Sequence, residues 1–444
     1  MKRYFTPLAI VALLSAAWTA AQGVTLDEAV QTALEASPDV QSAEYRVDAA
    51  RAMLKQAKSA YYPWISVSAN YARSDNPPQA FMMTLNQRSL NMMDPAFNPN
   101  EPDETENLRG SIGLQWRLFD SGRREADRHM AKYGARAAAE ALAAAQNELA
   151  HEVTRGFYGV LQARAFAEVQ HEAVRSIEES LRIANERFAA GSAVKTDVLN
   201  LETQLAQARE DLIKVQNGTR LAVAALNTAI GKELATADNL QAPSVSLDAP
   251  PPECRDPNAY ENRPELRAAR LMTRIKAQDM KKAKRGYGPT LSAFASSDWD
   301  SDASSDFEQS YMAGVMAELN VFDGFRTRGA VAAAVSEHEA AKADEQRAVN
   351  NLKLDLTQAF LGAQDAWERL NVTRKSLESA QEAQRIVREQ YEQGAADIAI
   401  LLQTQVGVTA MQTRNVAAQY DYLTALSNLK RAKGEWVKES DAKR

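Results

Sequence analysis

This chain of 444 residues has a single cysteine and no excess of positive charge. Its single cysteine, Cys254, cannot form a disulfide within the chain, and one thiol cannot build a cysteine-based metal site. The formal net charge is −6, so the chain lacks the surplus of Lys and Arg that binds a phosphate backbone. These absences argue against a disulfide-stapled domain and against nucleic-acid binding.

Long apolar runs are scarce as well, and the one near the start resembles a targeting signal. Lys2 and Arg3 precede the apolar stretch 5–17, and small residues follow at 19–21. This order predicts a cleaved export signal over residues 1–21. No later segment has about 18 consecutive apolar residues, so we predict no transmembrane helix. The only cysteine lies far from the cleavage site, so lipidation of the N-terminus is not expected.

Proline is missing from two very long stretches, 103–242 and 290–444. A proline inside a helix costs about 3 kcal/mol, so its absence permits helices of unusual length. We predict a helix over 123–190, a turn at Gly191 and a returning helix over 195–230.

The returning helix has the apolar spacing of a coiled coil. Its apolar positions alternate in steps of four and three, with one polar member, Thr219. The positions are Leu201, Leu205, Ala208, Leu212, Val215, Thr219, Ala222 and Leu226. The pattern predicts a long antiparallel coiled-coil hairpin. Three glycines in its first helix, Gly134, Gly156 and Gly159, are interpreted as points of close helix–helix approach.

The sequence contains an internal repeat. Segment 37–66 aligns with 263–292, and farther on the dipeptide Phe-Asp and the turn glycine both recur at an offset of 203 residues, the latter as Gly191 and Gly394. Equal spacing predicts a second hairpin of the same length. The predicted organisation is a first repeat over 22–230, a linker over 231–262, a second repeat over 263–435 with helices over 326–393 and 397–433, and a C-terminal tail over 436–444.

Four segments alternate apolar and polar residues with the period of a β-strand. They cover 64–73, 108–119, 290–299 and 311–322, and the outer loops 74–107 and 300–310 join them in pairs. A half-buried soluble sheet and a membrane β-barrel explain the alternation about equally well, and the export signal favours the barrel. Four strands cannot close a barrel, so several copies of the chain would have to assemble.

These features resemble the TolC family of outer-membrane efflux channels. The resemblance covers nearly the whole chain after the signal and includes the phrases LFDSGRR at 118–124 and RFAAGSAVKTDVLNLE at 187–202. It implies a mainly α-helical fold with a small β part: a homotrimer with a twelve-stranded barrel in the outer membrane and an α-helical tunnel through the periplasm. It also implies a passive conduit that is docked by a periplasmic adaptor and, through it, an inner-membrane pump.

The family resemblance assigns roles to the two hairpin tips. The residues implied in adaptor docking are Arg187, Phe188, Gly191, Asp197, Val198, Leu199, Gly394, Leu401 and Leu402, and those implied in the periplasmic gate are Tyr391, Asp397 and Gln403. The best-known member of the family uses an arginine and acidic residues near the second tip, where this chain has Ala396, Ile400 and Gln403. We therefore predict closure by apolar and tyrosine packing, unless Asp397 substitutes for the acidic ring.

Two further groups of residues are predicted to join strand to helix. They are Phe119, Asp120, Gly122 and Arg123 in the first repeat, and Phe322, Asp323, Gly324 and Arg326 in the second. Asp120 is expected to cap the helix that follows it, because a carboxylate accepts the free N–H groups of a first turn.

Other functions fit less well. An exported coiled-coil adaptor should carry Gly-rich β-domains, and a structural coiled coil without a pore would not need the strand alternation. We find no phosphate-binding loop, nucleophile motif or paired histidines, so neither an enzyme nor a cofactor is predicted. Two loop clusters contain side chains that can bind metal ions, but we interpret neither as a metal site. Met82, Met83, Met92 and Met93 are interpreted as apolar packing within or between outer loops, and Asp298, Asp300, Asp302 and Asp306 as a solvated acidic loop.

Overall fold

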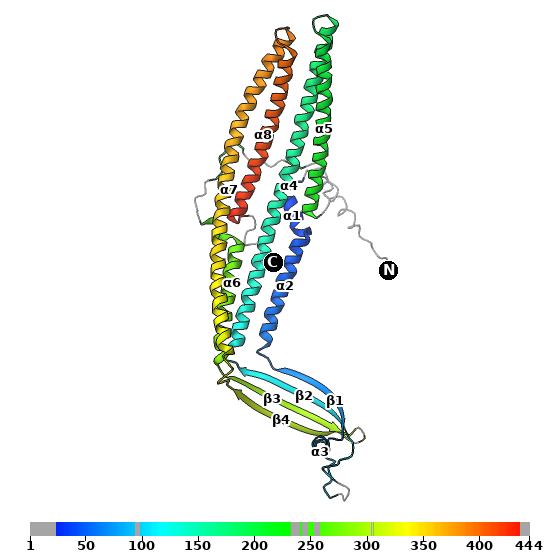
Figure 1. Ribbon diagram of the computed structural model, residues 1–444, viewed down its shortest axis with the longest axis vertical. Coiled ribbons are helices and arrows are strands. Elements are labelled where there is room, and N and C mark those ends of the chain that lie inside the picture. The colour runs from blue at the N-terminus through cyan, green and yellow to red at the C-terminus, as the bar shows by residue number, and fades with distance from the viewer. Residues whose placement is uncertain are drawn as a thin grey trace, which may run out of the picture. The chain divides into compact units, whose positions relative to one another are not determined.

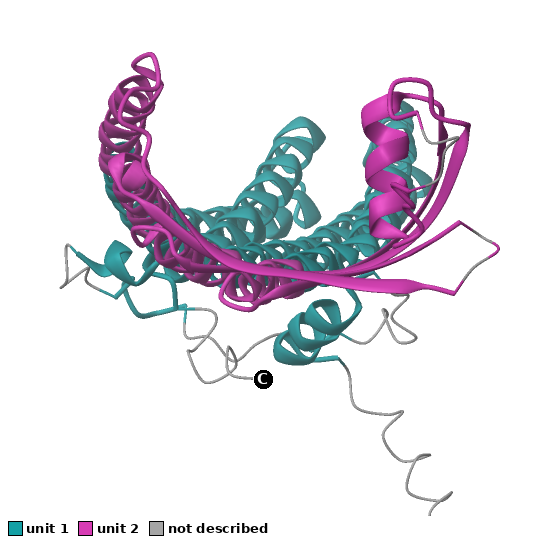
Figure 2. Ribbon diagram, turned by 90° about the horizontal axis from the view of Figure 1, so that it is seen from below, with its two compact units in different colours: residues 1–46, 139–268, 347–444 teal, residues 47–138, 269–346 magenta. Residues whose placement is uncertain are grey.

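The computed structural model describes residues 24–93, 98–231, 240–241, 247–252, 258–302, 304 and 306–435 (Figure 1). The predicted signal over 1–21, Cys254 and the tail over 436–444 lie outside these ranges. The chain divides into two compact units, coloured in Figure 2. Unit 1 comprises residues 1–46, 139–268 and 347–444, and unit 2 comprises residues 47–138 and 269–346.

Two long helical hairpins dominate the fold. The first consists of α4 (Arg123–Ala189) and α5 (Lys195–Ile230), and the second of α7 (Arg326–Glu392) and α8 (Ile398–Lys433). The first helix of each pair has 67 residues and the second has 36, so the predicted repeat of equal hairpins is confirmed. Both hairpins also end on a glycine with positive φ, Gly231 and Gly434. None of the described helices is long and apolar enough to cross a membrane.

Shorter helices precede the strands. They are α1 (Leu26–Ala36), α2 (Pro38–Ser59), the 3-10 helix η2 (Ala259–Asn262), α6 (Pro264–Lys284) and the 3-10 helix η3 (Arg285–Tyr287). Both α2 and α6 begin with proline, which has no N–H to leave unpaired in a first turn. Thr25 and Glu28 form a reciprocal capping box at the start of α1.

The strands form one antiparallel sheet in the order β1-β2-β3-β4. Their bounds are β1 (Trp64–Ser74), β2 (Thr105–Phe119), β3 (Thr290–Ser301) and β4 (Glu308–Glu318). Directly paired residues point to the same face, and the pairs Val67–Ile112 and Ala293–Val315 place apolar side chains together. The predicted alternation is therefore confirmed, and its apolar face is exposed in the single chain, as at Val67 (78% exposed).

Several predicted bounds around the sheet are wrong. The outer loop 74–107 contains a helix, α3 (Pro77–Asn86), and β2 and β4 each begin three residues early, at Thr105 and Glu308. The last strand ends at Glu318 rather than at 322, because its partner β3 begins at Thr290, directly after Pro289. Proline has no N–H for a sheet ladder, so residues beyond Glu318 have no strand to pair with.

The acidic outer loop is also corrected. Asp298 and Asp300 lie within β3, and Asp300 is only 1% exposed, so these two are part of the sheet and not of a solvated loop. The methionines behave differently. Met92 and Met93 are exposed in the single chain, which leaves their predicted packing between loops untested.

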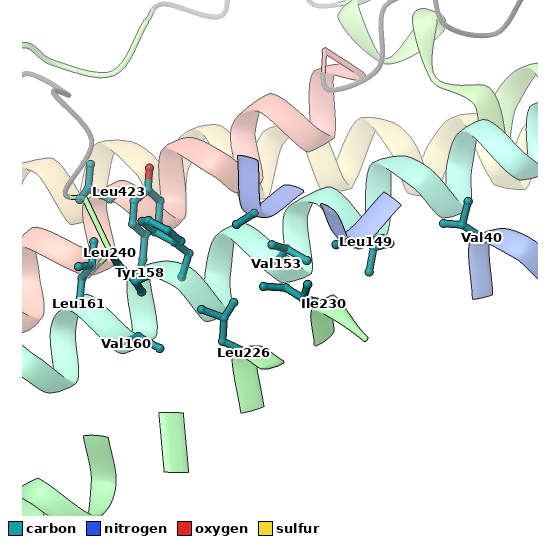
Figure 3. Close-up of a cluster of buried hydrophobic side chains, with 13 residues drawn as sticks. Val40, Leu149, Val153, Tyr158, Val160, Leu161, Leu226, Ile230, Leu240 and Leu423 are labelled. Atoms are coloured by element: carbon teal, nitrogen blue, oxygen red, sulfur yellow. The ribbon is translucent and has the colours of Figure 1, made fainter. Parts of the chain in front are cut away.

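The largest core of unit 1 surrounds the middle of α4 (Figure 3). Val153 and Phe157 of α4 are fully buried there with Leu226 and Ile230 of α5. A Cβ added to Gly156 would lie 3.3 Å from the Leu226 side chain, which agrees with the predicted close approach. An added Cβ at Gly134 or Gly159 would meet no described atom within 4 Å, so neither glycine marks a close approach between helices of the same chain.

Candidate functional site

The two hairpin tips are built by the same turn. At the first tip Gly191 has φ +73°, and the Ser192 N–H donates to the Arg187 carbonyl at 2.8 Å. At the second tip Gly394 has φ +78°, and the Ala395 N–H donates to the Gln390 carbonyl at 2.8 Å. This is the glycine-dependent helix ending in which the chain reverses over a left-handed residue. Both predicted tip glycines therefore adopt a left-handed backbone conformation that residues with a side chain rarely adopt.

Tyr391 connects the two hairpins at their tips. Its side chain is 3% exposed, and the Arg187 guanidinium lies 4.9 Å from its ring centroid. Arg187 Nη1 also donates to the Tyr391 carbonyl at 2.5 Å. Burial raises the pKa of Tyr391, although the charge of Arg187 acts in the opposite direction. The buried Tyr391 hydroxyl has no hydrogen-bond partner among the described residues, so the ring and not the hydroxyl makes the contact.

An apolar cluster surrounds this pair, and we call it the tip cluster. It contains residues from all four hairpin helices or their ends, and its buried members are Ala184, Val198, Leu201, Tyr391, Ile398 and Leu401. Leu402 packs against it in part. Three predicted tip residues, Val198, Leu401 and Tyr391, thus meet in one core that holds the hairpins together.

Other predicted tip residues point elsewhere. Phe188 and Leu199 are 43% and 49% exposed, and Asp197 is half-buried. Gln403 is exposed and lies outside the tip cluster. Asp397 caps α8 by accepting the Ala399 N–H at 3.4 Å, so α8 begins one residue later than predicted. The Asp397 carboxylate therefore caps the helix that follows it.

A buried polar group beside the tip cluster was not predicted. The Gln405 amide, 4% exposed, donates to Ser180 Oγ at 2.8 Å and to Ser176 Oγ at 3.1 Å. Arg388 donates to the same Ser176 hydroxyl at 2.7 Å. Gln405 lies four residues after Leu401 and seven after Ile398, on the same face of α8. That spacing was the available signal that Gln405, and not Gln403, makes the contact between hairpins.

The two strand–helix joints are also equivalent. Asp120 is 3% exposed, and its carboxylate accepts the N–H groups of Gly122 at 3.1 Å and Arg124 at 2.9 Å, which confirms the predicted cap. In the second repeat Asp323 accepts the Thr327 N–H at 3.0 Å, at the same four-residue spacing. In both joints a carboxylate stabilises the positive end of a 67-residue helix.

The first joint is additionally tied to the start of β3. Arg123 donates to the carbonyls of Arg285 and Gly286 at 3.2 and 3.0 Å, and Ser121 donates to the Pro289 carbonyl at 2.7 Å. In the second joint the Arg326 side chain is 79% exposed and approaches Asp323 only to 4.0 Å. The predicted arginines Arg123 and Arg326 are therefore not equivalent in their contacts. Phe119 and Phe322 are 50% and 74% exposed.

A strong acid also lies at the first joint. Arg128 and Tyr61 each donate to the Glu125 carboxylate at 2.5 Å, and these two hydrogen bonds lower the pKa of Glu125 to about 2. Burial and the same contact raise the pKa of Tyr61. Glu125 is therefore charged over the whole physiological range, and any stability it contributes disappears only as the pH falls from about 4.3 toward 2.

Gly122 is the joint residue least able to accept a side chain. Its φ is +83°, and an added Cβ would lie 2.9 Å from Arg285 Nη1. We expect Gly122→Ala to lower the free energy of unfolding by at least about 1 kcal/mol, because of the left-handed backbone and the displaced arginine. Thermal unfolding of the purified protein measures this change. Gly134→Ala, within the helix α4 that follows Gly122, is the control and should be neutral or stabilising. Equal losses in the two variants would contradict this account of Gly122.

The comparisons with known proteins agree with this architecture. The family model of the outer membrane efflux protein matches residues 29–232 and 257–435, which is most of the chain. The chain therefore belongs to the outer membrane efflux protein family, whose members are export channels. Membership of this family therefore favours a channel over the two alternatives, a coiled-coil adaptor and a structural coiled coil without a pore.

Individual relatives are distant, and the share of each that the chain covers varies: the chain spans nearly all of some relatives but only about three fifths of another. The outer membrane protein TolC of Vibrio cholerae is 23% identical over 444 residues, covering 96% of this chain and 94% of that protein. The fusaric acid resistance protein FusA of Burkholderia cepacia is 25% identical over 325 residues, covering 71% of this chain and 59% of that protein. The crystal structure of VceC from Vibrio cholerae superposes with a TM-score of 0.78 at 18% identity, covering 92% of this chain and 96% of that one, and so shows the same fold.

Proposed function

We propose that three copies of this chain assemble into one channel that carries cargo from the periplasm through the outer membrane. The observation that carries the proposal is the four-stranded sheet. Its outermost strands β1 and β4 each have one unpaired edge among the described residues, and one face is apolar and exposed. Unpaired edges are not viable in lipid, so the edges must pair with other copies, and three copies give twelve strands.

The polar face of the same sheet would then line a watery interior. Ser66, Ser68 and Asn70 of β1 alternate with the apolar residues of that strand. Arg109 of β2 lies directly opposite Asp300 of β3 and belongs to the same face. A transmembrane barrel requires this combination of a lipid-facing apolar surface and a polar lumen.

The hairpin tips would form the periplasmic end of the conduit. The tip cluster and the Arg187–Tyr391 contact hold the two hairpins of one chain together, which supports a closed gate made from apolar and tyrosine packing. Phe188 and Leu199 are exposed at the same tip and supply an apolar surface for a periplasmic adaptor. The adaptor, an inner-membrane pump that drives transport, and the cleaved signal over 1–21 are parts of this proposal.

Assembly and conduction can be tested on the full-length protein in a Gram-negative host. We expect the protein to require detergent for extraction from outer membranes, to migrate as a trimer after crosslinking, and to form ion channels in planar bilayers. Extraction by salt or alkali alone, with a monomeric protein and no conductance, would overturn the proposal. Adaptor docking is tested separately with Cys254→Ser chains carrying Phe188→Cys or Leu199→Cys, which should crosslink to a co-expressed adaptor. Ile213→Cys, also exposed on α5, is the control.

A further inference from the structure

The first outer loop, 74–107, is longer than the second, and part of it folds into the helix α3, which lies on the polar face of the sheet. Gln87, which directly follows α3, donates to the Asn107 side chain at 3.0 Å and to the Glu106 carbonyl at 2.6 Å. Asn107 shares its face with Arg109, two residues along the same strand. That face is opposite to the one that carries Ile112. The contact is also far from the joint, since Asn107 precedes Phe119 by twelve residues in β2 (Figure 1).

A buried charge anchors this helix. Asp300 of β3 is 1% exposed, and its Oδ1 accepts hydrogen bonds from Asn107 and from Arg109 Nε, both at 2.7 Å. A carboxylate this deeply buried is stable only when it is paired and hydrogen-bonded. Both donors come from β2, and the Asn107 side chain also accepts the hydrogen bond from Gln87. The network therefore joins α3, β2 and β3, and we call it the loop latch.

A second contact extends the attachment across the sheet. Arg88 has a left-handed φ of +53°, which is uncommon for a residue with a side chain. Its Nη2 donates to the Gln309 carbonyl at 3.1 Å, and its Nη1 lies 3.0 Å from Glu308 Oε2. Glu308 of β4 is paired with Asp300 and so belongs to the polar face. The segment thus touches side chains of that face from β2 to β4.

A simple surface insertion would not require these features. A loop that only tolerated extra residues could remain solvated, whereas this one buries Ala80, Gln87 and Asn107. The corresponding connection of the second repeat, 302–307, contains no helix among its described residues. The folded loop therefore occurs once per chain and lies on the surface that the proposed function assigns to the lumen.

We propose that α3 is a lid that narrows the outer exit of the channel, held in place by the loop latch. This inference rests on the proposed function, because the polar face lines a lumen only in the assembled barrel. Three lids, one per chain, would restrict the passage of bulky solutes at the outer end. The tips would control the periplasmic end independently.

The lid is tested by replacing residues 76–88 with a short Gly-Ser linker in the full-length protein. Single-channel conductance and the largest polyethylene glycol that enters from the outer side are measured in bilayers, with and without Tyr391→Ala to open the tips. We expect the deletion to raise the conductance several-fold in the open-tip background and to admit larger polymers. Gln87→Ala, which weakens the latch but keeps α3, should give a smaller change in the same direction.

A control variant and the assembly of the variants decide between the possible outcomes. The double variant Met92→Ser with Met93→Ser alters exposed loop residues and should change neither the conductance nor the polymer cut-off. If the deletion and Gln87→Ala both form trimers with unchanged conductance and polymer cut-off, α3 is not a lid, although the channel proposal survives. If the unaltered protein forms no channel, both proposals fail together. Should the deletion not assemble, Gln87→Ala alone decides the outcome.

Discussion

Replacing Tyr391 by alanine is expected to open the channel at its periplasmic end. The ring is 3% exposed within the tip cluster and lies against Arg187, so its removal takes away the largest side chain that joins the hairpins. Truncating a buried aromatic residue typically costs about 3–5 kcal/mol. Since each 1.4 kcal/mol changes an equilibrium about tenfold, even a part of this loss would shift a closed gate strongly toward open. Single-channel recording should show a several-fold rise in conductance.

Tyr391→Phe separates the ring from the hydroxyl. The Tyr391 hydroxyl is buried without a partner among the described residues, so its loss removes no hydrogen bond and leaves the apolar contact intact. We expect Tyr391→Phe to remain as closed as the unaltered protein. A Phe variant that conducts like the Ala variant would show that the hydroxyl, bonded to a neighbouring copy, holds the gate.

Two charged residues complete this experiment. Arg187→Met should raise the conductance less than Tyr391→Ala, because it removes the guanidinium contact and the hydrogen bond to the Tyr391 carbonyl but leaves the tip cluster. Asp397→Ala should leave the channel closed, because the Asp397 carboxylate caps α8. A leaky Asp397→Ala channel would instead restore the idea of an acidic gate ring.

The hairpins were predictable because their signals are local. The absence of proline over long stretches and the recurrence of Gly191 as Gly394 give helix length and turn position directly. The strands were predictable for a similar reason, since alternation is visible within one segment. The end of β4 was not, because it depends on where the partner strand begins, and Pro289 sets that limit from 29 residues away.

The side-chain hydrogen bonds between distant segments could not be predicted from the sequence. Gln87 and Asn107 are separated by 20 residues, and Asn107 and Asp300 by 193, so nothing local shows that they meet. The helix α3 was not predicted, although Pro77 and Pro78 fit the first turn of a helix because proline has no N–H to leave unpaired there. Gln405 was missed for a different reason: the family resemblance drew attention to Gln403, while the helical period selected Gln405.

A large effect on stability is also expected at Asp355. Its two oxygens bind two arginines, Arg263 through Nη1 and Arg431 through Nη2 at 2.9 Å. The Arg263 and Arg431 side chains are only 6% and 17% exposed. This arrangement ties the segment before α6 to α7 and α8 next to a cluster that includes Leu266, Leu356 and Leu429. Asp355 is therefore the shared anion of a largely buried network.

We expect Asp355→Ala to lower the free energy of unfolding by about 3 kcal/mol, because it removes the carboxylate that two largely buried arginines share and leaves Arg263 with Glu265 alone. Thermal and denaturant unfolding of the trimer in detergent would measure the loss. Asp365→Ala is the matched control on the same helix, since Asp365 and its partner Arg369 are 68% and 54% exposed and surface pairs contribute little. Similar effects in the two variants would show that Asp355 is not a structural anion.

The same network predicts a pH dependence. Burial alone would raise the pKa of Glu265, but the hydrogen bond and charge of Arg263 outweigh it and hold that pKa below its ordinary value. A carboxyl whose pKa is lower in the folded state stabilises the fold above its unfolded pKa of about 4.3 and loses that contribution as the pH falls below it. The unaltered protein should therefore lose stability in acid below this point. The Glu265→Gln variant should lose less stability over the same pH interval, because it has no carboxyl to protonate at this position. An identical loss of stability in both proteins would show that Glu265 does not contribute to the acid response.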